Sequence, residues 1–459
     1  MTTEARWSRA DRAGTGRALR AAHPRTALGE LAVAGPDRDP VAQLEDQATS
    51  RVPELVPIRY GRMAAGAFPF LRGSAVVMAS DLAASPNSGL RVQLCGDAHL
   101  SNFGLFASPE RRLLFDLNDF DETAPGPFEW DVQRLVASVE VAARANGFDE
   151  KDRRRTLLAC AGAYREAMRR FAAMSEIDVW YARLDVEEAS AATGIRRYGR
   201  RTVEKARRRD HASSLERLTE VVGGRRRFVS DPPWVRTVED LAGEAGRADL
   251  ARDMDDLLSS YAQTLQSDRQ RLIRRYRLVD MARKVVGVGS VGTRAWILLV
   301  VADEGDDALV LQAKEAQASV LEEHTGSVAG PHGRRVVEGQ RLMQAASDIF
   351  LGWETVHGLD GVQRDFYVRQ LRDWKGSAEV EQLDPTTMAR YVRLCAWTLA
   401  RAHARSGDRI AIAAYLGGSR RADEAFADFG AAYAERTAED HARLLAAIDT
   451  GRLVAAAED

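Results

Sequence analysis

The segment GDAHLSN at residues 96–102 places an acid, a histidine and an amide close together in the chain. Asp97 and Asn102 are five residues apart, and His99 lies between them. Phosphoryl transfer to an alcohol uses one carboxylate to orient and deprotonate the hydroxyl, and an amide oxygen to help hold Mg²⁺ against the phosphates. Asp97 is therefore the candidate base and Asn102 the candidate metal ligand.

A second acidic segment, DLNDFDE at residues 116–122, follows the apolar runs FGLF and LLFDL, which a turn-forming SPER sequence separates. This pattern predicts a β-hairpin that returns the chain toward the first segment. The second carboxylate that the metal needs would come from Asp116 or Asp119. The two segments in this order are more informative than either one alone, because each by itself is typical of a turn or a solvated acidic loop.

A glycine-rich turn, GVGSVG, lies much further along the chain. It contains Gly287, Gly289, Ser290 and Gly292. Such a turn binds a dinucleotide when it opens a helix, but here the apolar run RAWILLVV follows it and predicts a strand. A glycine turn between two strands is the phosphate-covering hairpin of kinases. Lys314, at the end of the next run LVLQAK, is then expected to contact the phosphates.

Lysine is rare in this chain. The sequence has 65 Lys and Arg residues, of which only five are lysines, so arginine supplies the ordinary surface charge and the position of Lys314 is informative. Glu338 follows Lys314 by 24 residues on a predicted helix and is the candidate partner of the lysine. Arg62 and Arg72 flank the segment GAFPF, where they either contact phosphate or pair with structural carboxylates.

These motifs resemble the protein-kinase-like superfamily, nearest its aminoglycoside and choline phosphotransferase branch. GDAHLSN resembles the catalytic loop of that branch, with Cys95 in place of the leading His. The resemblance implies that Asp97 is the catalytic base, that Asn102 is a Mg²⁺ ligand and that His99 fills the second His position.

The segment FDLNDFDE resembles the metal-binding segment of the same superfamily. Asp116 fits the spacing from the hairpin, whereas Asp119 fits the local Asp-Phe pattern. Asp131, in PGPFEWDVQRL, resembles the buried Asp that ties the catalytic loop to the following helix. From about residue 50 to 435, segments such as NDFDET, VGVGSVGTR and VRQLRDWKGS resemble the DUF2252 proteins, a family of uncharacterised bacterial proteins.

The elements around the motifs predict a helix-dominant α+β fold. In kinases the glycine turn, lysine and glutamate precede the catalytic loop, whereas here they follow it by about 190 residues. The resemblance therefore implies a two-lobed, protein-kinase-like fold in circularly permuted order. The expected divisions are a mobile N-terminal arm (1–50), the catalytic-loop part of the helical lobe (51–145), a helical substrate region (146–280), a strand-rich nucleotide-binding lobe (281–377) and C-terminal helices that complete the helical lobe (378–459).

Composition excludes several classes of protein. The net charge of −2 argues against a general nucleic-acid binder, and the arginine-rich stretch at 196–209 is more typical of a solvated helix face. The three cysteines are widely separated, which indicates neither a disulfide framework nor a zinc site. The start of the chain has no apolar core of a signal peptide, and the longest apolar run, WILLVVA, is too short to span a membrane. A cytoplasmic location is expected.

Together the motifs predict an ATP- and Mg²⁺-dependent phosphotransferase that moves the γ-phosphate to a hydroxyl of an unidentified small-molecule or protein acceptor. Three alternatives remain open: nucleotidyl transfer to a protein on the same fold, a nucleotide-binding scaffold without turnover, and a metal-dependent phosphoesterase built on the two acidic segments. The presence of a base favours turnover over binding alone. The phosphoesterase leaves the glycine turn and the lysine unexplained.

Overall fold

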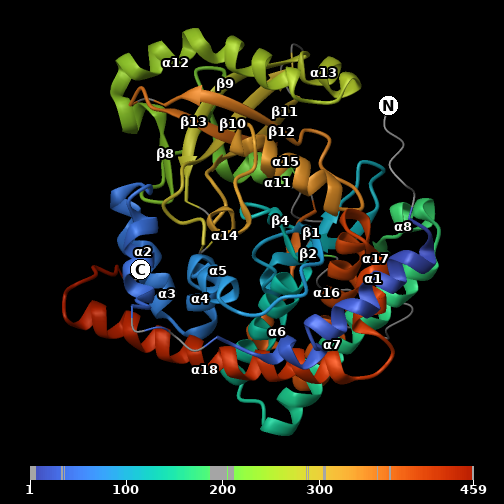
Figure 1. Ribbon diagram of the computed structural model, residues 1–459. Coiled ribbons are helices and arrows are strands. Elements are labelled where there is room, and N and C mark those ends of the chain that lie inside the picture. The colour runs from blue at the N-terminus through green and yellow to red at the C-terminus, as the bar shows by residue number, and fades with distance from the viewer. Residues whose placement is uncertain are drawn as a thin grey trace.

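The computed structural model describes residues 7–32, 35, 37–186, 204, 211–285, 287, 289–302, 307–358, 360–371 and 374–456. Helices dominate and the strands form several antiparallel sheets, which confirms the expected helix-dominant α+β class. Figure 1 shows a strand-rich upper part and a helical lower part, with helix α12 (Val238–Gln263) across the top. The arginine-rich stretch at 196–209 lies outside the described residues, apart from Glu204.

Six strands form an antiparallel sheet in the order β12-β13-β11-β10-β9-β8. Their bounds are Val235–Thr237 (β8), Tyr276–Lys284 (β9), Ala295–Ala302 (β10), Ala308–Ala316 (β11), Gly352–His357 (β12) and Gln363–Gln370 (β13). Because side chains alternate along a strand, Leu309 and Leu311 point to one face of β11, and Val310 and Lys314 to the other. The first face packs in one apolar cluster with residues of α12 and α13 (Ser267–Ile273).

A segment that precedes the sheet in the chain covers part of the face that carries Lys314. It consists of α11 (His211–Leu218) and the hairpin of β6 (Thr219–Val222) and β7 (Arg225–Phe228). Leu218 and Phe228 pack in one apolar cluster with Val310. The sheet itself begins with β8 and β9, so it takes in residues that the expected division assigned to the helical region 146–280.

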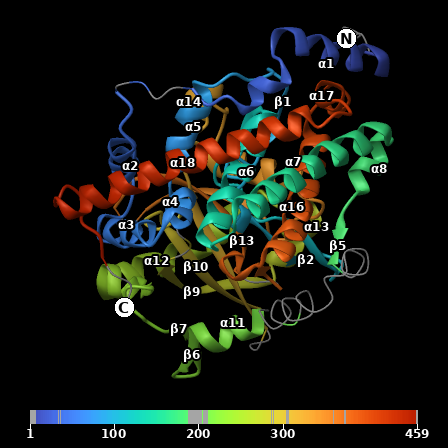
Figure 2. The same cartoon turned by 90° about the horizontal axis from the view of Figure 1, so that it is seen from below.

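The helical part is built around a large hydrophobic core. Its main helices are α6 (Phe128–Ala145), α7 (Glu150–Ala173), α16 (Pro385–Ser406), α17 (Arg409–Leu416) and α18 (Arg421–Asp449). Helices α7 and α16 pack along each other, and the long helix α18 runs across α6 and α7 (Figure 2). Leu135 and Val136 of α6 and Leu399 of α16 are fully buried in this core. The apolar spacing of three and four residues in these helices predicts this packing.

Two smaller sheets lie near the middle of the molecule. Their strands are β1 (Arg91–Leu94) with β4 (Ala124–Pro127), and β2 (Phe103–Ala107), β3 (Leu113–Leu117), β5 (Leu184–Asp185) and β14 (Gly376–Ser377) in the order β14-β2-β3-β5. The pairing of β2 with β3 confirms the hairpin that the sequence predicts. After the hairpin, the N–H of Asn118 donates to the carbonyl of Asn102 at 2.9 Å, which returns the second acidic segment to the first.

The described part of residues 1–50 does not form the expected mobile arm. Helix α1 (Arg9–Ala22) packs along α17 so closely that a Cβ atom on Gly16 would lie 2.1 Å from the carbonyl oxygen of Ala411. Small residues permit this close approach. They also give the segment its weak apolar periodicity, so the sequence pattern contains no sign of the docking.

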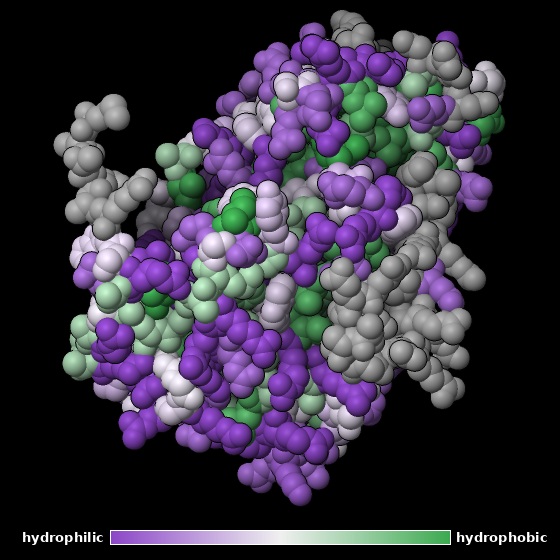
Figure 3. All heavy atoms as spheres, turned by 90° about the vertical axis from the view of Figure 1, so that its right-hand side faces the viewer, coloured by the Kyte–Doolittle hydropathy of each residue, from purple (hydrophilic) through white to green (hydrophobic). Residues whose placement is uncertain are grey.

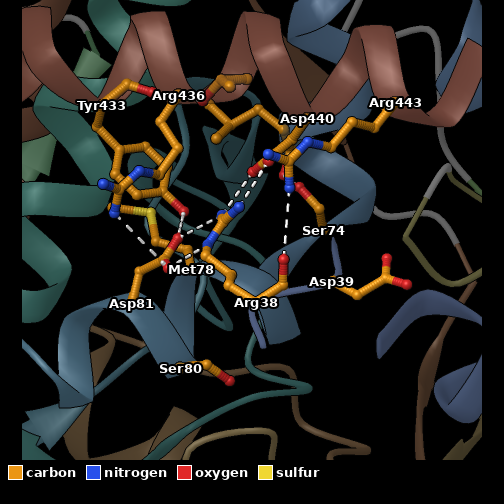
Figure 4. A network of polar contacts seen from close by, with 12 residues as sticks. Arg38, Asp39, Ser74, Met78, Ser80, Asp81, Tyr433, Arg436, Asp440 and Arg443 are labelled. Atoms are coloured by element: carbon orange, nitrogen blue, oxygen red, sulfur yellow. Dashed lines mark hydrogen bonds and ion pairs between the residues drawn. The ribbon is translucent and has the colours of Figure 1, made fainter. Parts of the chain in front are cut away.

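Arg38 ties the N-terminal segment to two helices of the helical part (Figure 4). Its Nε donates to Oδ1 of Asp81 at 2.7 Å, and its Nη2 donates to Oδ2 of Asp440 at 2.6 Å. The hydroxyl of Tyr433 also donates to Asp81, at 3.0 Å. Only 5% of the Asp81 side chain and 3% of the Asp440 side chain are exposed, so the charges of this network are balanced within the protein.

The remaining elements are short. They are α2 (Pro40–Ala48), α3 (Val56–Ala64), α4 (Ala67–Gly73), α5 (Ala75–Ala83), α8 (Glu176–Tyr181), α14 (Glu322–Thr325), α15 (His332–Met343) and the 3₁₀ helices at Arg25–Gly29, Pro53–Leu55, Leu100–Asn102 and Val380–Gln382. None of the helices in the described ranges combines the length and the apolar character that a membrane span requires. On the face shown in Figure 3, hydrophilic and hydrophobic side chains are interspersed.

Candidate functional site

A cavity of about 210 Å³ lies where the six-stranded sheet meets the loops that follow β1 and β3. The predicted site residues that line it are Asp97, His99, Asn102, Asp119, Gly287, Gly289 and Ser290. Lys314 reaches the wall of the same cavity, because its Nζ lies 2.7 Å from Oδ2 of Asp121 and 3.8 Å from Oδ2 of Asp119. The fold thus brings together two groups of residues that are about 190 positions apart in the chain.

The backbone before Asp97 is fixed by α6. The N–H groups of Cys95 and Gly96 donate to the carboxylate of Asp131 at 2.8 and 3.0 Å, which confirms the expected tie between this loop and the following helix. Gly96 has a φ of 85°, and a Cβ atom there would lie 2.0 Å from the carbonyl oxygen of Glu122. A glycine is required at this position, because the two acidic segments pack directly against each other there.

Asp97 is held between a cation and an imidazole. Nε of Arg134 donates to Oδ1 of Asp97 at 2.8 Å, and Nε2 of His99 lies 3.5 Å from Oδ2. Burial raises the pKa of Asp97 to about 6 against the opposing charge of Arg134, and the neighbouring carboxylate of Asp119 adds to the rise. A carboxyl group with this pKa is mostly ionised at neutral pH and is a stronger proton acceptor than an ordinary aspartate.

His99 is a neutral imidazole in this environment. Its side chain is buried, and burial together with the charges of Arg72 and Arg134 lowers its pKa well below the usual value. Its Nδ1 has no hydrogen-bond partner among the residues that the structure describes. This nitrogen is therefore an unsatisfied buried polar atom of a residue that lines the cavity.

Asp116 lies outside the cavity. Nη2 of Arg401 donates to its Oδ1 at 2.6 Å, and the N–H of Ala345 donates to its Oδ2 at 2.9 Å. Its side chain is only 2% exposed, and both oxygens tie β3 to other parts of the fold. Asp119, by contrast, lines the cavity together with Asn102. Of the two candidate metal carboxylates, the structure brings Asp119 to the other site residues.

Asp121 is a site residue that sequence reasoning missed. It accepts hydrogen bonds from Nζ of Lys314 at 2.7 Å, from the hydroxyl of Tyr367 at 2.6 Å and from Oγ of Ser290 at 3.2 Å. Burial alone would lower the pKa of Lys314, but the negative charges of Asp119 and Asp121 have a larger effect and raise it. Burial also opposes the charge on Asp121, yet Lys314 lowers the pKa of that carboxyl to about 2. Both groups are therefore charged.

Glu338 does not hold Lys314, contrary to the expectation from the sequence. Its Oε1 accepts a hydrogen bond from Nε of Arg334 at 2.7 Å, and 55% of its side chain is exposed. The inward side of α15 carries Arg335, whose Nη2 donates to the carbonyl of Asp121 at 2.8 Å. The helix follows the lysine strand as predicted, but its rotation turns Glu338 to the surface, and Asp121 supplies the carboxylate instead.

The glycine turn connects β9 to β10, as the sequence predicts. Its φ angles are 66° at Gly287 and 89° at Gly292, a region that favours glycine. A Cβ atom on Gly289 would lie 3.1 Å from the carbonyl oxygen of Arg72. The turn therefore closes over the cavity against α4, with the hydroxyl of Ser290 directed to Asp121.

Asn102 and Asp119 offer oxygen donors that fit a Mg²⁺ ion. Nδ2 of Asn102 donates to the carbonyl of Asp97 at 2.6 Å, which leaves the amide oxygen for another contact. Burial and the charge of Asp121 raise the pKa of Asp119, so a cation beside this carboxylate would be stabilising. The described residues contain no cluster of three or more Asp, Glu, His or Cys side chains that could hold a metal ion. Mg²⁺ is commonly held by one or two carboxylates together with substrate phosphates and water.

Three arginines also line the cavity: Arg51, Arg59 and Arg72. Sequence reasoning named only Arg72, and it left open whether that side chain contacts phosphate or a carboxylate. Nothing in the spacing of Arg51 or Arg59 distinguishes them from the other arginines of the chain. The position of Arg51 in the cavity depends on its contacts with the glycine turn, and that of Arg59 on the packing of α3.

Residues 51–447 match a family model described as "Uncharacterized protein conserved in bacteria (DUF2252)". No curated protein matches the chain, and no solved structure matches it.

Proposed function

The chain belongs to the DUF2252 family, and from its cavity we propose that it is an ATP- and Mg²⁺-dependent phosphotransferase, which moves the γ-phosphate to a hydroxyl of an acceptor. One observation carries the proposal: Asp97, Asn102 and Asp119 share a cavity with a glycine turn and have Lys314 at its wall. These residue types are the base, the metal ligands and the phosphate-binding cation that phosphoryl transfer uses.

The order of the elements supports a two-lobed, kinase-like fold in permuted order. Strands β9 and β10 flank the glycine turn, β11 carries the lysine, and α15 precedes β12 and β13, as in the glycine-loop, lysine-strand and helix order of kinases. Helix α16 follows this sheet. Its His403 contacts Asp131 with Nε2 at 3.1 Å from Oδ2, and Asp131 fixes the loop before Asp97. The C-terminal helix α16 is thus linked to the proposed catalytic loop through the buried carboxylate of Asp131.

The residues have distinct roles in the proposed reaction. Asp97 orients the acceptor hydroxyl and takes its proton as the hydroxyl oxygen bonds to the γ-phosphorus and ADP leaves. Asn102 and Asp119 would hold Mg²⁺, which neutralises phosphate charge when it is bound. Lys314, kept charged by Asp121, contacts the phosphates. Such positioning and charge neutralisation account for most catalysis of phosphoryl transfer.

We expect α11 to move when a nucleotide binds. The base of the nucleotide is expected beside Lys314 on the same face of the sheet, where Leu218 and Val310 lie in one apolar cluster. We therefore expect amide hydrogen exchange in residues 211–228 to increase when Mg·ATP binds. Unchanged exchange in a chain that does bind Mg·ATP would show that the base lies elsewhere.

The proposal is tested with ATP labelled at the γ- or the α-phosphate, with cell extract as the source of acceptor. We expect transfer of the γ-label, reduced about 10²- to 10⁴-fold in Asp97→Asn, with Mg·ATP binding retained. The exposed Asp256→Asn serves as a matched control and should leave transfer unchanged. Transfer of the α-label would instead show nucleotidyl transfer, and binding without any transfer would show a scaffold.

A further inference from the structure

Three arginines from the N-terminal part of the chain line the cavity on elements that the proposed ATP and Mg²⁺ contacts do not use. Arg51 follows α2, Arg59 lies on α3 and Arg72 lies on α4. Arg59 is fully buried, Arg51 is 8% exposed, and Arg72 is half-buried. Burial of this much positive charge in one place is costly unless negative charge compensates it.

The hydrogen bonds of these arginines go to neutral groups. Nη1 of Arg51 donates to two carbonyl groups of the glycine turn, at 2.9 and 2.5 Å. Nη2 of Arg59 donates to the side-chain oxygen of Gln47 at 2.6 Å and to the carbonyl of Gly73 at 2.7 Å. For Arg72, the described part of the chain provides no hydrogen-bond or ion-pair partner. These contacts orient the side chains without an ion pair. Carboxylates act on Arg51 and Arg72 only from a greater distance, chiefly Glu122 on Arg51 and Glu381 on Arg72.

Several donor atoms around the cavity are buried and unused. Within the described ranges, Nε of Arg51, Nε and Nη1 of Arg59 and Nε of Arg72 have no hydrogen-bond partner. Nor does any described carboxylate lie within ion-pair distance of the three arginines. Burial, and then the charge of Arg51, lowers the pKa of Arg59 well below its usual value. A group that carries negative charge and several acceptor oxygens would satisfy these atoms together.

We infer that Arg51, Arg59 and Arg72 bind a phosphate group of the acceptor, so that the acceptor is a phosphorylated compound with a free hydroxyl. The inference rests on the proposed function, because Asp97 must act on a hydroxyl of the same molecule. Guanidinium groups present several N–H donors in a planar fork that matches phosphate oxygens, which a single ammonium does not.

The neighbourhood of Asp97 assigns this phosphate to the acceptor rather than to the nucleotide. Arg72 lines the same cavity as Asp97 and His99. The reacting hydroxyl has to lie at Asp97, so the phosphate at Arg72 belongs to the molecule that carries this hydroxyl. The nucleotide already has a separate set of contacts in Lys314, Asn102 and Asp119.

The test is isothermal titration of the full chain with inorganic phosphate, first alone and then with saturating Mg²⁺ and a non-hydrolysable ATP analogue. We expect one phosphate to bind in both conditions. Arg72→Gln should bind phosphate at least roughly tenfold more weakly, because it loses a charged hydrogen-bonding group, and should keep its affinity for the analogue. The phosphate affinity of Arg72→Lys should lie between those of the wild type and Arg72→Gln. The phosphate affinity of the exposed Arg421→Gln should equal that of the wild type.

Equal phosphate affinity in the wild type and Arg72→Gln would overturn the inference. One-for-one competition between phosphate and the analogue would overturn it as well, because the arginines would then hold a phosphate of the nucleotide. A different result would contradict the proposed function alone. In that case the wild type would bind phosphate through Arg72 but would not bind the ATP analogue, so the anion site would be present without the ATP site. The melting temperature of each variant shows whether a loss of binding reflects unfolding.

Discussion

The Arg38 network and the cavity arginines use the same side chain in opposite ways. Arg38 lies between two buried aspartates, Asp81 and Asp440, and donates to both (Figure 4). Arg59 is more completely buried, yet it donates only to a glutamine side chain and a backbone carbonyl. The first charge is balanced by carboxylates within the protein, whereas the second has no carboxylate partner among the described residues.

This difference shows that the contacts of an arginine indicate its role better than its occurrence in the sequence does. Arginine is the ordinary cation of this chain, so its number and spacing in the sequence indicate little about function. The carboxylates that complete the Arg38 network come from positions 43 and 402 residues away in the chain. Only the folded arrangement separates arginines that stabilise the fold from arginines that are available to a ligand.

The largest effect is expected for Arg38→Ala. It leaves the buried carboxylate of Asp440 without the cation that it contacts, and it leaves Asp81 with Arg436, whose Nη1 lies 3.8 Å away. The free energy of unfolding should fall by about 3–5 kcal/mol. Urea denaturation followed by circular dichroism measures the change, with the exposed Arg452→Ala, which also loses two carboxylate partners, as the control. If the two variants lost equal stability, burial would not be what makes the Arg38 network important.

An intermediate effect is expected for Arg134→Met, because Arg134 is paired with Asp97, which lines the cavity. Its charge opposes the rise in the pKa of Asp97 to about 6, so its removal should raise that pKa further, by about one unit or more. Asp97 must be ionised to accept a proton, so transfer should increase with pH and its acid limb should move to higher pH. An unchanged midpoint in the pH-rate profile would argue against Asp97 as the base.

The smallest effect is expected for Arg59→Met. The substitution removes a buried charge that has no carboxylate partner, but it also removes the donor to Gln47 and to the carbonyl of Gly73. The free energy of unfolding in phosphate-free buffer should therefore fall by no more than about 1–3 kcal/mol. Addition of inorganic phosphate should stabilise the wild type and not this variant. Denaturation curves with and without phosphate measure both. A loss as large as that of Arg38→Ala would make Arg59 a structural residue.

Local patterns predicted much of the fold around the site. The hairpin of β2 and β3, the glycine turn between two strands, the lysine strand and helix α15 all follow from residue periodicity and turn residues that lie close together in the sequence. The docking of α1 could not be predicted in this way, because it depends on close contact between small residues such as Gly16 and Ala411, which lie at opposite ends of the chain.

Within the site, the sequence could not decide questions that depend on distant partners. Asp116 and Asp119 lie in the same short segment, so local spacing does not distinguish them. Arg401, which is 285 residues away, donates a hydrogen bond to Asp116 and holds it in the core. Likewise, the helix that carries Glu338 was predicted, but the rotation of that helix about its axis is set by packing. Asp121 is adjacent to the recognised motif, yet only the structure shows its contact with Lys314.

The most direct test of the central claim is titration of Mg·ATP into the wild type, Lys314→Met and Lys151→Met. Lys151 is an exposed lysine at the start of α7 and provides the matched control. The account predicts that the wild type and Lys151→Met bind one Mg·ATP alike, and that a folded Lys314→Met binds it at least roughly tenfold more weakly, since a charged phosphate contact is lost. Absence of binding by the wild type, or equal binding by Lys314→Met, would contradict it.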